Sequence, residues 1–232
     1  MKKSLHIKLI LKFILKGISY FSLTIIGFHA IFFAIVFFAS VFLNFFNPPF
    51  TNLMIYRLVK NRYPLKKSKF IELKKIPESA KRMLLKIEDY KFYKHYGIDP
   101  EAILESYETN RRLGYIYRGG STITQQLART LFLTPKKSYV RKYFEILIAM
   151  EMELFLSKDR ILELYFNYVE WGKGIYGIET ASTVYYKKSV TRLNYDEIAR
   201  LVTILASPIK YTPYTFENRA ALKYRYSTLL SM

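Results

Sequence analysis

The stretch RGGSTITQQLART, from Arg118 to Thr130, places two glycines, a series of hydroxyls and two adjacent amides directly before an apolar run. Gly119 and Gly120 permit backbone conformations and close approaches that residues with a Cβ resist. Thr122, with Gln125 three residues later, matches a capping box. The stretch therefore predicts a loop that enters a helix near residue 123.

The helix after this loop has an apolar side and a polar side. Its apolar positions recur every four residues, as on the buried stripe of an amphipathic helix: Ile123, Leu127 and Leu131. The polar side chains are Ser121, Thr124, Gln125, Gln126 and Arg129. They fit either an ordinary capped surface helix or an anion seat, in which backbone N–H groups at the helix start act with hydroxyls, amides and a guanidinium. The stretch alone leaves both interpretations open.

One segment near the N-terminus has the length of a membrane span. The 30 residues from Gly17 to Phe46 carry no formal charge, whereas about 20 apolar residues cross the hydrocarbon layer. A cleaved signal peptide usually has an apolar core of about 7–15 residues and a small-residue cleavage site, so we interpret the segment as an uncleaved anchor. His29 inside it is expected to face the interface or a partner helix rather than to act chemically.

The charges on either side of this span settle its orientation only in part. Five lysines and no acid precede it, which favours a cytoplasmic position for residues 1–16: Lys2, Lys3, Lys8, Lys12 and Lys16. The basic segment that follows is opposed only by Glu72 and contains Arg57, Lys60, Arg62, Lys66, Lys67, Lys69, Lys74 and Lys75. Charge counting alone therefore does not place the rest of the chain outside the cytoplasm.

The formal net charge of +19 points to anionic partners. Nucleic acid, anionic lipid headgroups and a pyrophosphate-bearing substrate all fit such an excess of positive charge. Because the basic segment directly follows the span, lipid headgroups are the nearest candidate. The chain contains no cysteine, which is compatible with an oxidising compartment.

Helix signals dominate from Ile76 onward, so we predict a mainly α-helical domain. Asp99-Pro100 is a cap followed by proline at the first helical position, and Asn194 with Glu197 forms a second capping box. We divide the chain into a basic N-terminus, a transmembrane anchor, a basic juxtamembrane linker and one domain: residues 1–16, 17–46, 47–75 and 76–232.

Two acidic residues end a predicted helix within KIEDYKFYKHYGIDPEA, from Lys86 to Ala102. Glu88 and Asp89 stand directly before an irregular, aromatic-rich stretch. A carboxylate at the negative end of a helix dipole is a stronger base, which suits general-base catalysis. The alternative is a solvated helix end whose acids pair with nearby lysines.

A second group of charges lies between Lys136 and Asn167. Arg141 and Glu145 are four residues apart and Lys142 and Glu145 three, so these side chains share one side of a helix. A routine surface ion pair explains this spacing and contributes only about 0.3–0.5 kcal/mol. An acid held among cations beside the glycine-rich loop is instead typical of a site.

Four motifs together resemble the peptidoglycan glycosyltransferases in their order and approximate spacing. They are EDYKFYKHYGID (88–99), RGGSTITQQLARTLFL (118–133), RKYFEILIAMEMELFLSKDRILELYFN (141–167) and WGKGIYGIETASTVYY (171–186). The resemblance covers about residues 76–213, and GGSTITQQ is its most specific element. The chain looks like the monofunctional, membrane-anchored form of this family, which has no transpeptidase domain.

The resemblance implies a fold and a reaction. The family has a lysozyme-like helical fold with two lobes and polymerises lipid II outside the cytoplasmic membrane. The lipid-linked growing glycan is the donor, and its polyprenyl pyrophosphate leaves. The 4-hydroxyl of the incoming lipid II attacks, so an α-linked donor is inverted to a β-1,4 bond.

The resemblance also implies roles for individual residues. Glu88 matches the general base and Glu145 the second glutamate of the cleft. Substrate-binding positions match Asp89, Phe92, His95, Gly120, Ser121, Thr122, Gln125, Gln126, Arg129, Lys137, Arg141 and Lys142. The chain departs from the family at Arg129-Thr130, where Lys-Asn is commoner, and at Lys137, where some members carry Arg; these departures leave the leaving-group role of Arg129 open.

Other functions explain less of the sequence. A lytic enzyme of related fold needs only one acid and water. That function would account neither for the membrane span nor for the second glutamate. A tethered nucleic-acid binder fits the charge, but no nucleic-acid motif is present. A non-enzymatic scaffold requires a dead site, whereas both glutamates are present. The sequence does not establish that a cofactor is required. Mg²⁺ or Mn²⁺ is a candidate at the Glu88-Asp89 pair. Proteins of cell-wall synthesis or division are candidate partners.

Overall fold

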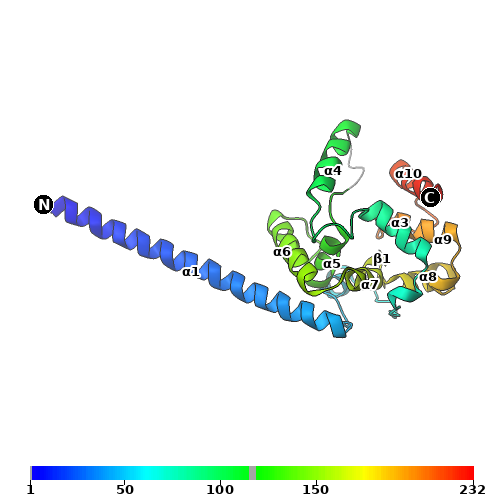
Figure 1. Ribbon diagram of the computed structural model, residues 1–232, viewed down its shortest axis with the longest axis horizontal. Coiled ribbons are helices and arrows are strands. Elements are labelled where there is room, and N and C mark those ends of the chain that lie inside the picture. The colour runs from blue at the N-terminus through cyan, green and yellow to red at the C-terminus, as the bar shows by residue number, and fades with distance from the viewer. Residues whose placement is uncertain (1, 115–118) are drawn as a thin grey trace.

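The computed structural model describes residues 2–114 and 119–232. One long helix, α1 (Lys2–Phe45), projects from a compact group of helices that contains the C-terminus (Figure 1). Arg118, which begins the quoted stretch, lies outside the described residues, as do the side chains of residues 1–10 with Lys2, Lys3 and Lys8.

Short helices build the domain, which confirms the mainly α fold. In chain order they are α2 (Asn52–Asn61), the 3-10 helix η1 (Leu73–Lys75), α3 (Glu78–Glu88), α4 (Pro100–Leu113), α5 (Ile123–Phe132), α6 (Tyr139–Phe155), α7 (Lys158–Tyr168), α8 (Ile178–Tyr186), η2 (Val190–Arg192), α9 (Tyr195–Ile204) and α10 (Ala220–Leu230). The strands β1 (Glu170–Gly172) and β2 (Ile175–Tyr176) form one antiparallel hairpin between α7 and α8.

Local signals in the sequence set several of these helix starts. Both predicted capping boxes form, at Thr122 with Gln125 and at Asn194 with Glu197. The Asp99 side chain accepts a hydrogen bond from the backbone N–H of Ala102, with proline at the start of α4. Each cap satisfies N–H groups that have no partner within the helix, so α5, α4 and α9 begin where the sequence predicts.

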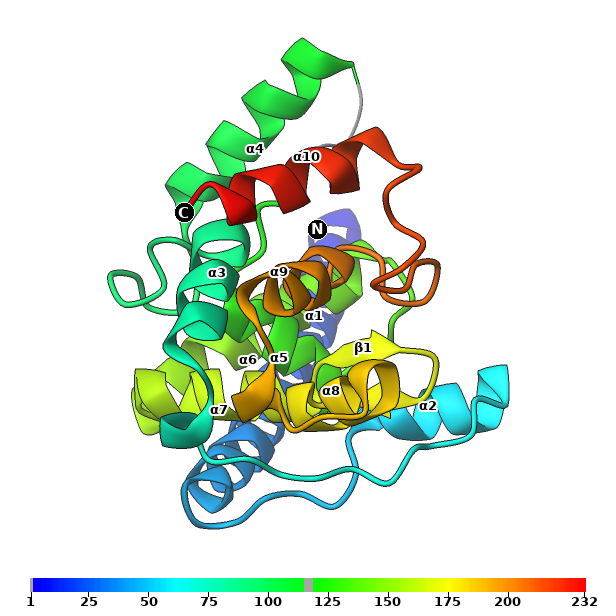
Figure 2. The same ribbon diagram turned by 90° about the vertical axis from the view of Figure 1, so that its right-hand side faces the viewer.

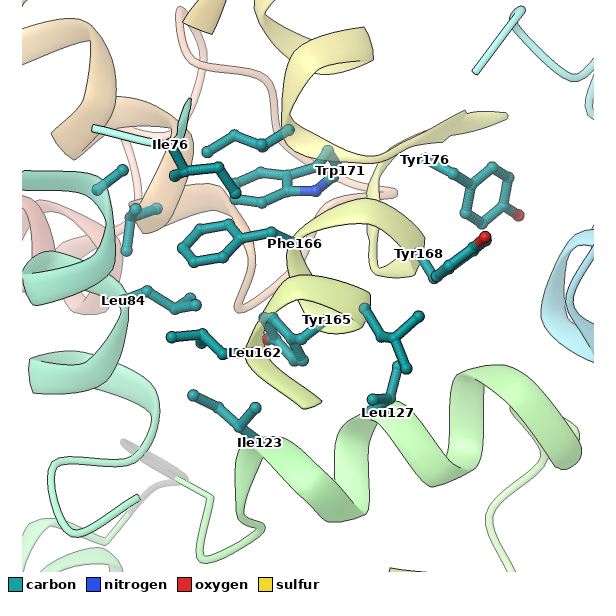
Figure 3. Packing of buried hydrophobic residues seen from close by; sticks show 14 of the residues in the cluster. Ile76, Leu84, Ile123, Leu127, Leu162, Tyr165, Phe166, Tyr168, Trp171 and Tyr176 are labelled. Carbon is teal, nitrogen blue, oxygen red and sulfur yellow. The ribbon is translucent and has the colours of Figure 1, made fainter. Parts of the chain in front are cut away.

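The helices pack in two groups. Helices α3, α9 and α10 lie against one another, as Figure 2 shows, and α5 packs against α6 and α7. Within the second group, Ile123 and Leu127 of α5 face Leu162 and Tyr165 of α7 (Figure 3), and all four side chains are buried. The predicted apolar stripe of α5 is therefore the side that enters the core.

Helix α1 is long and apolar enough to cross a membrane, over Leu11–Phe45. Its C-terminal half also packs along α6, where the rings of Phe32 and Phe144 lie 4.9 Å apart and those of Phe37 and Phe155 lie 4.8 Å apart. His29 Nε2 lies 3.0 Å from the Tyr143 hydroxyl of α6. The expectation that His29 faces a partner helix is confirmed, and that helix belongs to the domain.

The segment 47–75, expected as a linker, is folded onto the domain. Leu53 and Met54 of α2 are buried. The Asn167 side chain accepts from the Ile71 N–H at 2.8 Å and donates to the Ile71 carbonyl at 2.8 Å. Gly174 lets the chain pass so closely that a Cβ there would lie 2.2 Å from the Pro64 carbonyl oxygen. Charge composition suggested a tether because it does not reveal these backbone contacts.

Acids hold three of the eight basic residues of this segment. Arg57 pairs with Glu170, both of them largely buried, at 3.0 Å. Lys74 and Lys75 pair with Glu72, and the hydrogen bonds from these two ammonium groups, that of Lys74 first, lower the pKa of Glu72 to about 2. The five other basic side chains are exposed: Lys60, Arg62, Lys66, Lys67 and Lys69.

Candidate active site

A cleft of about 580 Å³ lies between the C-terminal end of α3, the start of α5 and the chain that carries α9 and α10. One wall holds the predicted residues Glu88, Asp89, Gly120, Ser121, Thr122, Gln126 and Arg129. The other wall contributes Lys210, Arg219 and Arg225. The cleft thus joins the first two motifs to the C-terminal part of the chain.

Glu88 is the last residue of α3, and its carboxylate is held from two sides. Arg225 of α10 forms an ion pair with Oε1, and the Gln126 side-chain amide donates to Oε2 at 2.9 Å. The side chains of Glu88 and Arg225 are 12% and 14% exposed, so the pair is mostly screened from solvent. A carboxylate at the cleft wall therefore has a fixed position, and it is no freely solvated helix end.

The neighbouring acid, Asp89, has a different role. It is buried, and its oxygens lie 2.9 and 3.0 Å from His95 Nε2, while Oδ2 also accepts the backbone N–H of Ile123 at 2.9 Å. An acid at this place stabilises the positive end of the α5 dipole. Asp89 therefore fixes the start of α5 relative to the end of α3.

Phe92 and His95, expected to bind substrate, lie behind this contact and do not line the cleft. Phe92 is 1% exposed, and the Lys158 ammonium lies 4.5 Å from its ring centre. The His95 side chain is 8% exposed. Because Asp89 binds both His95 and the start of α5, the intervening loop turns these two rings into the core. The structure thus gives them supporting contacts behind the cleft, and their contact with substrate stays a prediction.

The start of α5 brings together the groups that were predicted to form an anion seat. Lys142 of α6 donates to Ser121 Oγ at 2.9 Å and to Gln125 Oε1 at 3.1 Å. Gly120 passes close to α4, because a Cβ there would lie 2.7 Å from the Ile103 Cα. Thr122 caps the helix and donates its hydroxyl to the Gly97 carbonyl at 2.7 Å. Hydroxyl, amide and ammonium groups therefore meet at one helix N-terminus.

Glu145 is the centre of a cluster of positive charges beside this seat. Its side chain is fully buried and pairs with Arg141 and, at 2.6 Å, with Lys142. Arg129 of α5 approaches to 3.8 Å. Three cations surround one carboxylate, so the cluster keeps an excess of positive charge. The routine surface pair is excluded, because an exposed pair leaves its acid in water.

The remaining predicted residues occupy different positions relative to the cleft. Gln125 is fully buried within its capping box. Arg141 and Lys142 stand behind Arg129, held by Glu145. Lys137 is exposed in the loop before α6 and does not line the cleft described above. Arg129, with a side chain 35% exposed, is the cation of the cluster that lines the cleft.

Sequence reasoning missed the groups that come from the C-terminal wall. Arg225 lies 137 residues from Glu88, beyond the stretch in which motifs were found. No local period or spacing relates two such positions. The available signal was compositional: Lys210, Arg219 and Arg225 add cations close to the end of the chain.

Known proteins match the chain over most of its length. A family model described as Transglycosylase matches residues 57–232, so it includes most of the segment expected as a linker. A biosynthetic peptidoglycan transglycosylase of Paraburkholderia phytofirmans is 42% identical over 71% of this chain and 70% of its own. A protein with the same description from Thiobacillus denitrificans is 40% identical over 72% of this chain and 74% of its own. Penicillin-binding protein 1A of Aquifex aeolicus is 42% identical over 67% of this chain and 22% of its own. The chain therefore belongs to the transglycosylase family, together with biosynthetic peptidoglycan transglycosylases and a penicillin-binding protein.

Proposed function

We propose that this transglycosylase polymerises lipid II into β-1,4-linked glycan strands with inversion, and that Glu88 is the general base. One observation carries the assignment: a fixed carboxylate and a cluster of cations lie on one cleft, joined through Gln126 and the start of α5. Proton transfer and departure of an anion need these two kinds of group on either side of a reacting sugar.

The reaction assigns one task to each side. The 4-hydroxyl of the acceptor gives its proton to Glu88 while its oxygen forms a bond to C1 of the donor sugar. The bond from C1 to the pyrophosphate breaks on the opposite face, and the electron pair leaves with the pyrophosphate. Two donors already contact Glu88, but an ionised carboxylate has about four acceptor positions, so Arg225 and Gln126 leave room for the hydroxyl.

The cation cluster supports the departure of the pyrophosphate. Its negative charge grows as the bond breaks, so fixed cations and N–H groups stabilise the transition state more than the bound substrate. Arg129 reaches the cleft, while Arg141 and Lys142 are bound to Glu145 and contribute their field. The seat therefore serves the donor side of the reaction, and Glu88 the acceptor side.

The product distinguishes this function from related ones. Purified protein is incubated with lipid II, and the glycan is analysed by length. We expect longer, lipid-linked glycan from lipid II alone. Shortening of preformed glycan without polymer formation indicates a lytic enzyme instead, and an unchanged substrate under conditions where a relative is active contradicts the proposal.

Arg129→Ala tests the leaving-group role of the guanidinium. A hydrogen bond to a charged group contributes about 1.5–3 kcal/mol, so we expect turnover to fall roughly ten- to hundredfold, most clearly with long donors. Arg129→Lys keeps a cation and restores the commoner residue of the family, so it is expected to be tolerated. Initial rates with lipid II and with a lengthened donor measure both effects. Wild-type turnover in Arg129→Ala would assign the role to Lys137, Arg141 or Lys142.

Metal dependence stays a prediction that polymerisation with and without a chelator tests. Among residues 2–114 and 119–232 there is no group of three or more His, Cys, Asp or Glu able to hold a metal ion. Donors contact both oxygens of the Glu88 carboxylate. The Asp89 carboxylate is already bound by His95 and by the backbone N–H at the start of α5. A divalent cation at this cleft would therefore be held largely by the oxygens of the substrate pyrophosphate.

We place the domain on the extracytoplasmic side of the cytoplasmic membrane, where its lipid-linked substrate is polymerised. The five N-terminal lysines support a cytoplasmic start. The chain contains no cysteine, so single cysteines report the side directly. Ser68→Cys, in the exposed segment after the span, is expected to react with an impermeant maleimide in intact cells, and Ser4→Cys only after lysis. The reverse pattern contradicts the proposed orientation.

We propose that α6, rather than the basic segment, makes the additional membrane contact. About 20 residues cross a hydrocarbon layer of about 30 Å, so a span that starts at Gly17 ends near residue 36. By then α1 already touches Tyr143 and Phe144 of α6. Next to this contact α6 exposes further apolar side chains: Tyr139, Val140, Met150 and Leu154. Such a contiguous exposed apolar face is typical of a surface that meets a membrane.

A truncated protein without residues 1–46 separates the two contacts. Because burial of apolar surface does not depend on screening, we expect it to stay on anionic vesicles at high salt; a contact made by charges alone weakens. The measurement is vesicle co-sedimentation at low and high salt. Val140→Ser with Leu154→Ser, at positions 68% and 75% exposed, should reduce binding. The matched control replaces Lys66, Lys67 and Lys69 with Ser and should leave binding unchanged. Release of the control variant from vesicles, or release by salt, would identify the basic segment as the contact.

A further inference from the structure

Tyr165 brings a hydroxyl into the apolar core next to the cleft. The side chain belongs to α7, is fully buried and lies among Leu162, Ile123 and other apolar residues (Figure 3). Its hydroxyl donates to Gln126 Oε1 at 2.9 Å. The hydroxyl is therefore satisfied by a side chain of the candidate site, although Tyr165 itself does not line the cleft.

This hydrogen bond selects one orientation of the Gln126 amide. Gln126 Nε2 faces two acceptors, Glu88 Oε2 at 2.9 Å and the Ser121 carbonyl at 3.4 Å. On the other side, Oε1 faces the Tyr165 hydroxyl. The two ends of a glutamine amide are nearly equal in size but opposite in hydrogen bonding. Rotation by half a turn would place a carbonyl oxygen against the Glu88 carboxylate and leave the Tyr165 hydroxyl facing an NH₂ group, so the Tyr165 donor reinforces the orientation in which Glu88 meets the N–H end.

The Tyr165 hydroxyl is a permanent donor. Burial, reinforced by the negative charge of Glu88, raises the pKa of Tyr165 well above its usual value. The charges that act on it from the surrounding elements are Glu88 and Asp89 at the end of α3, Arg129 on α5 and Arg225 on α10. Because the hydroxyl keeps its proton throughout the working pH range, Gln126 Oε1 always meets a donor there.

We propose that Tyr165 is a positioning residue for glycan polymerisation: through the Gln126 amide it keeps an N–H donor on Glu88 and so holds the carboxylate aimed at the acceptor hydroxyl. The proposal rests on the proposed function, which makes Glu88 the base. Tyr165 would then affect proton transfer, which a tyrosine that only fills space in the core does not do.

Tyr165→Phe removes the hydroxyl and leaves the ring. Without the hydroxyl, Gln126 Oε1 loses its buried donor, so the amide is held less firmly and its N–H donor is less well aligned with Glu88; hydrogen-bond donors favour the charged form of a carboxylate. We expect kcat to fall about tenfold with little change in KM, the size of one lost hydrogen bond, and the acid limb of the pH–rate profile to move to higher pH. The position of this limb does not depend on how much of the variant is folded.

Tyr168→Phe is the matched control. Tyr168 lies three residues further along α7, is 5% exposed, and its hydroxyl donates to the Pro48 carbonyl at 2.8 Å, outside the cleft. Its removal is expected to lower the melting temperature without moving the pH–rate profile. If Tyr165→Phe shows the same pH–rate profile and kcat as Tyr168→Phe, the positioning role is overturned.

A double-mutant cycle tests the route through Gln126. If Tyr165 acts through the amide, Tyr165→Phe has no further effect on kcat once Gln126→Ala has removed that amide, whereas independent effects multiply. Multiplying effects contradict the proposal. Glu88→Gln separates this result from the proposed function: a nearly active Glu88→Gln removes the assignment of the base, while an inactive Glu88→Gln with multiplying effects removes only the role of Tyr165.

Discussion

Glu88→Gln is expected to reduce glycan polymerisation by roughly 10²–10⁴-fold, the range typical of a lost general base. Glutamine keeps the shape of the side chain and one acceptor oxygen, which can still accept from Arg225, but it cannot take up the proton of the acceptor hydroxyl. The pair that it interrupts lies at the cleft wall, with side chains 12% and 14% exposed. Because glutamine has the size of glutamate and leaves Arg225 with a hydrogen-bond acceptor, we expect the fold to survive while the chemistry stops.

Single-turnover kinetics with lipid II, together with thermal unfolding of the same preparation, measure this prediction. The control is Glu78→Gln, at the other end of α3, where the glutamate is 70% exposed and pairs with Lys81 at 2.9 Å. Loss of an exposed pair changes stability by only about 0–1 kcal/mol, so this variant should polymerise normally. A near-wild-type rate from folded Glu88→Gln would falsify the assignment of the base.

The parts of the fold that the sequence predicts correctly are those decided within a few residues. The capping box of Thr122 and Gln125 and the apolar stripe after it depend on contacts three or four positions apart. The same is true of Glu145 with Arg141 and Lys142, whose spacing on one helix predicted their contact. What spacing did not show is that Glu145 is fully buried, because burial depends on α5 packing across it.

Contacts between distant segments decide the rest. The pairing of Glu88 with Arg225 joins positions 137 residues apart, and the Ile71 backbone meets Asn167 across 96 residues. Neither is encoded in a local pattern, so the sequence indicated a base at a helix end without its partner Arg225, and a basic juxtamembrane linker without its contacts to the domain. His95 illustrates the same limit: its place in the motif suggested a ligand contact, while the fold turns it toward Asp89 and the core.

Glu145→Gln is expected to have the second largest effect, on both stability and activity. The fully buried carboxylate balances Arg141 and Lys142 and faces Arg129. Removal of one partner from a buried ion pair costs about 3–5 kcal/mol, because charges are left without compensation. The same repulsion moves the cations that stabilise the leaving pyrophosphate, and loss of such electrostatic support costs about 10²–10³-fold in turnover.

Glu153→Gln separates the two effects of this change. Glu153 lies on the same helix, α6, its side chain is 3% exposed, and it binds Lys158 at 2.7 Å and the Thr124 hydroxyl at 2.5 Å. It does not line the cleft, so its replacement should lower the free energy of unfolding to a similar extent and leave turnover per folded molecule unchanged. Chemical denaturation gives the stability of each variant, and rates corrected for the folded fraction give its activity. Equal corrected rates for the two variants would mean that Glu145 only supports the fold, and that the cation cluster does not contribute to departure of the pyrophosphate.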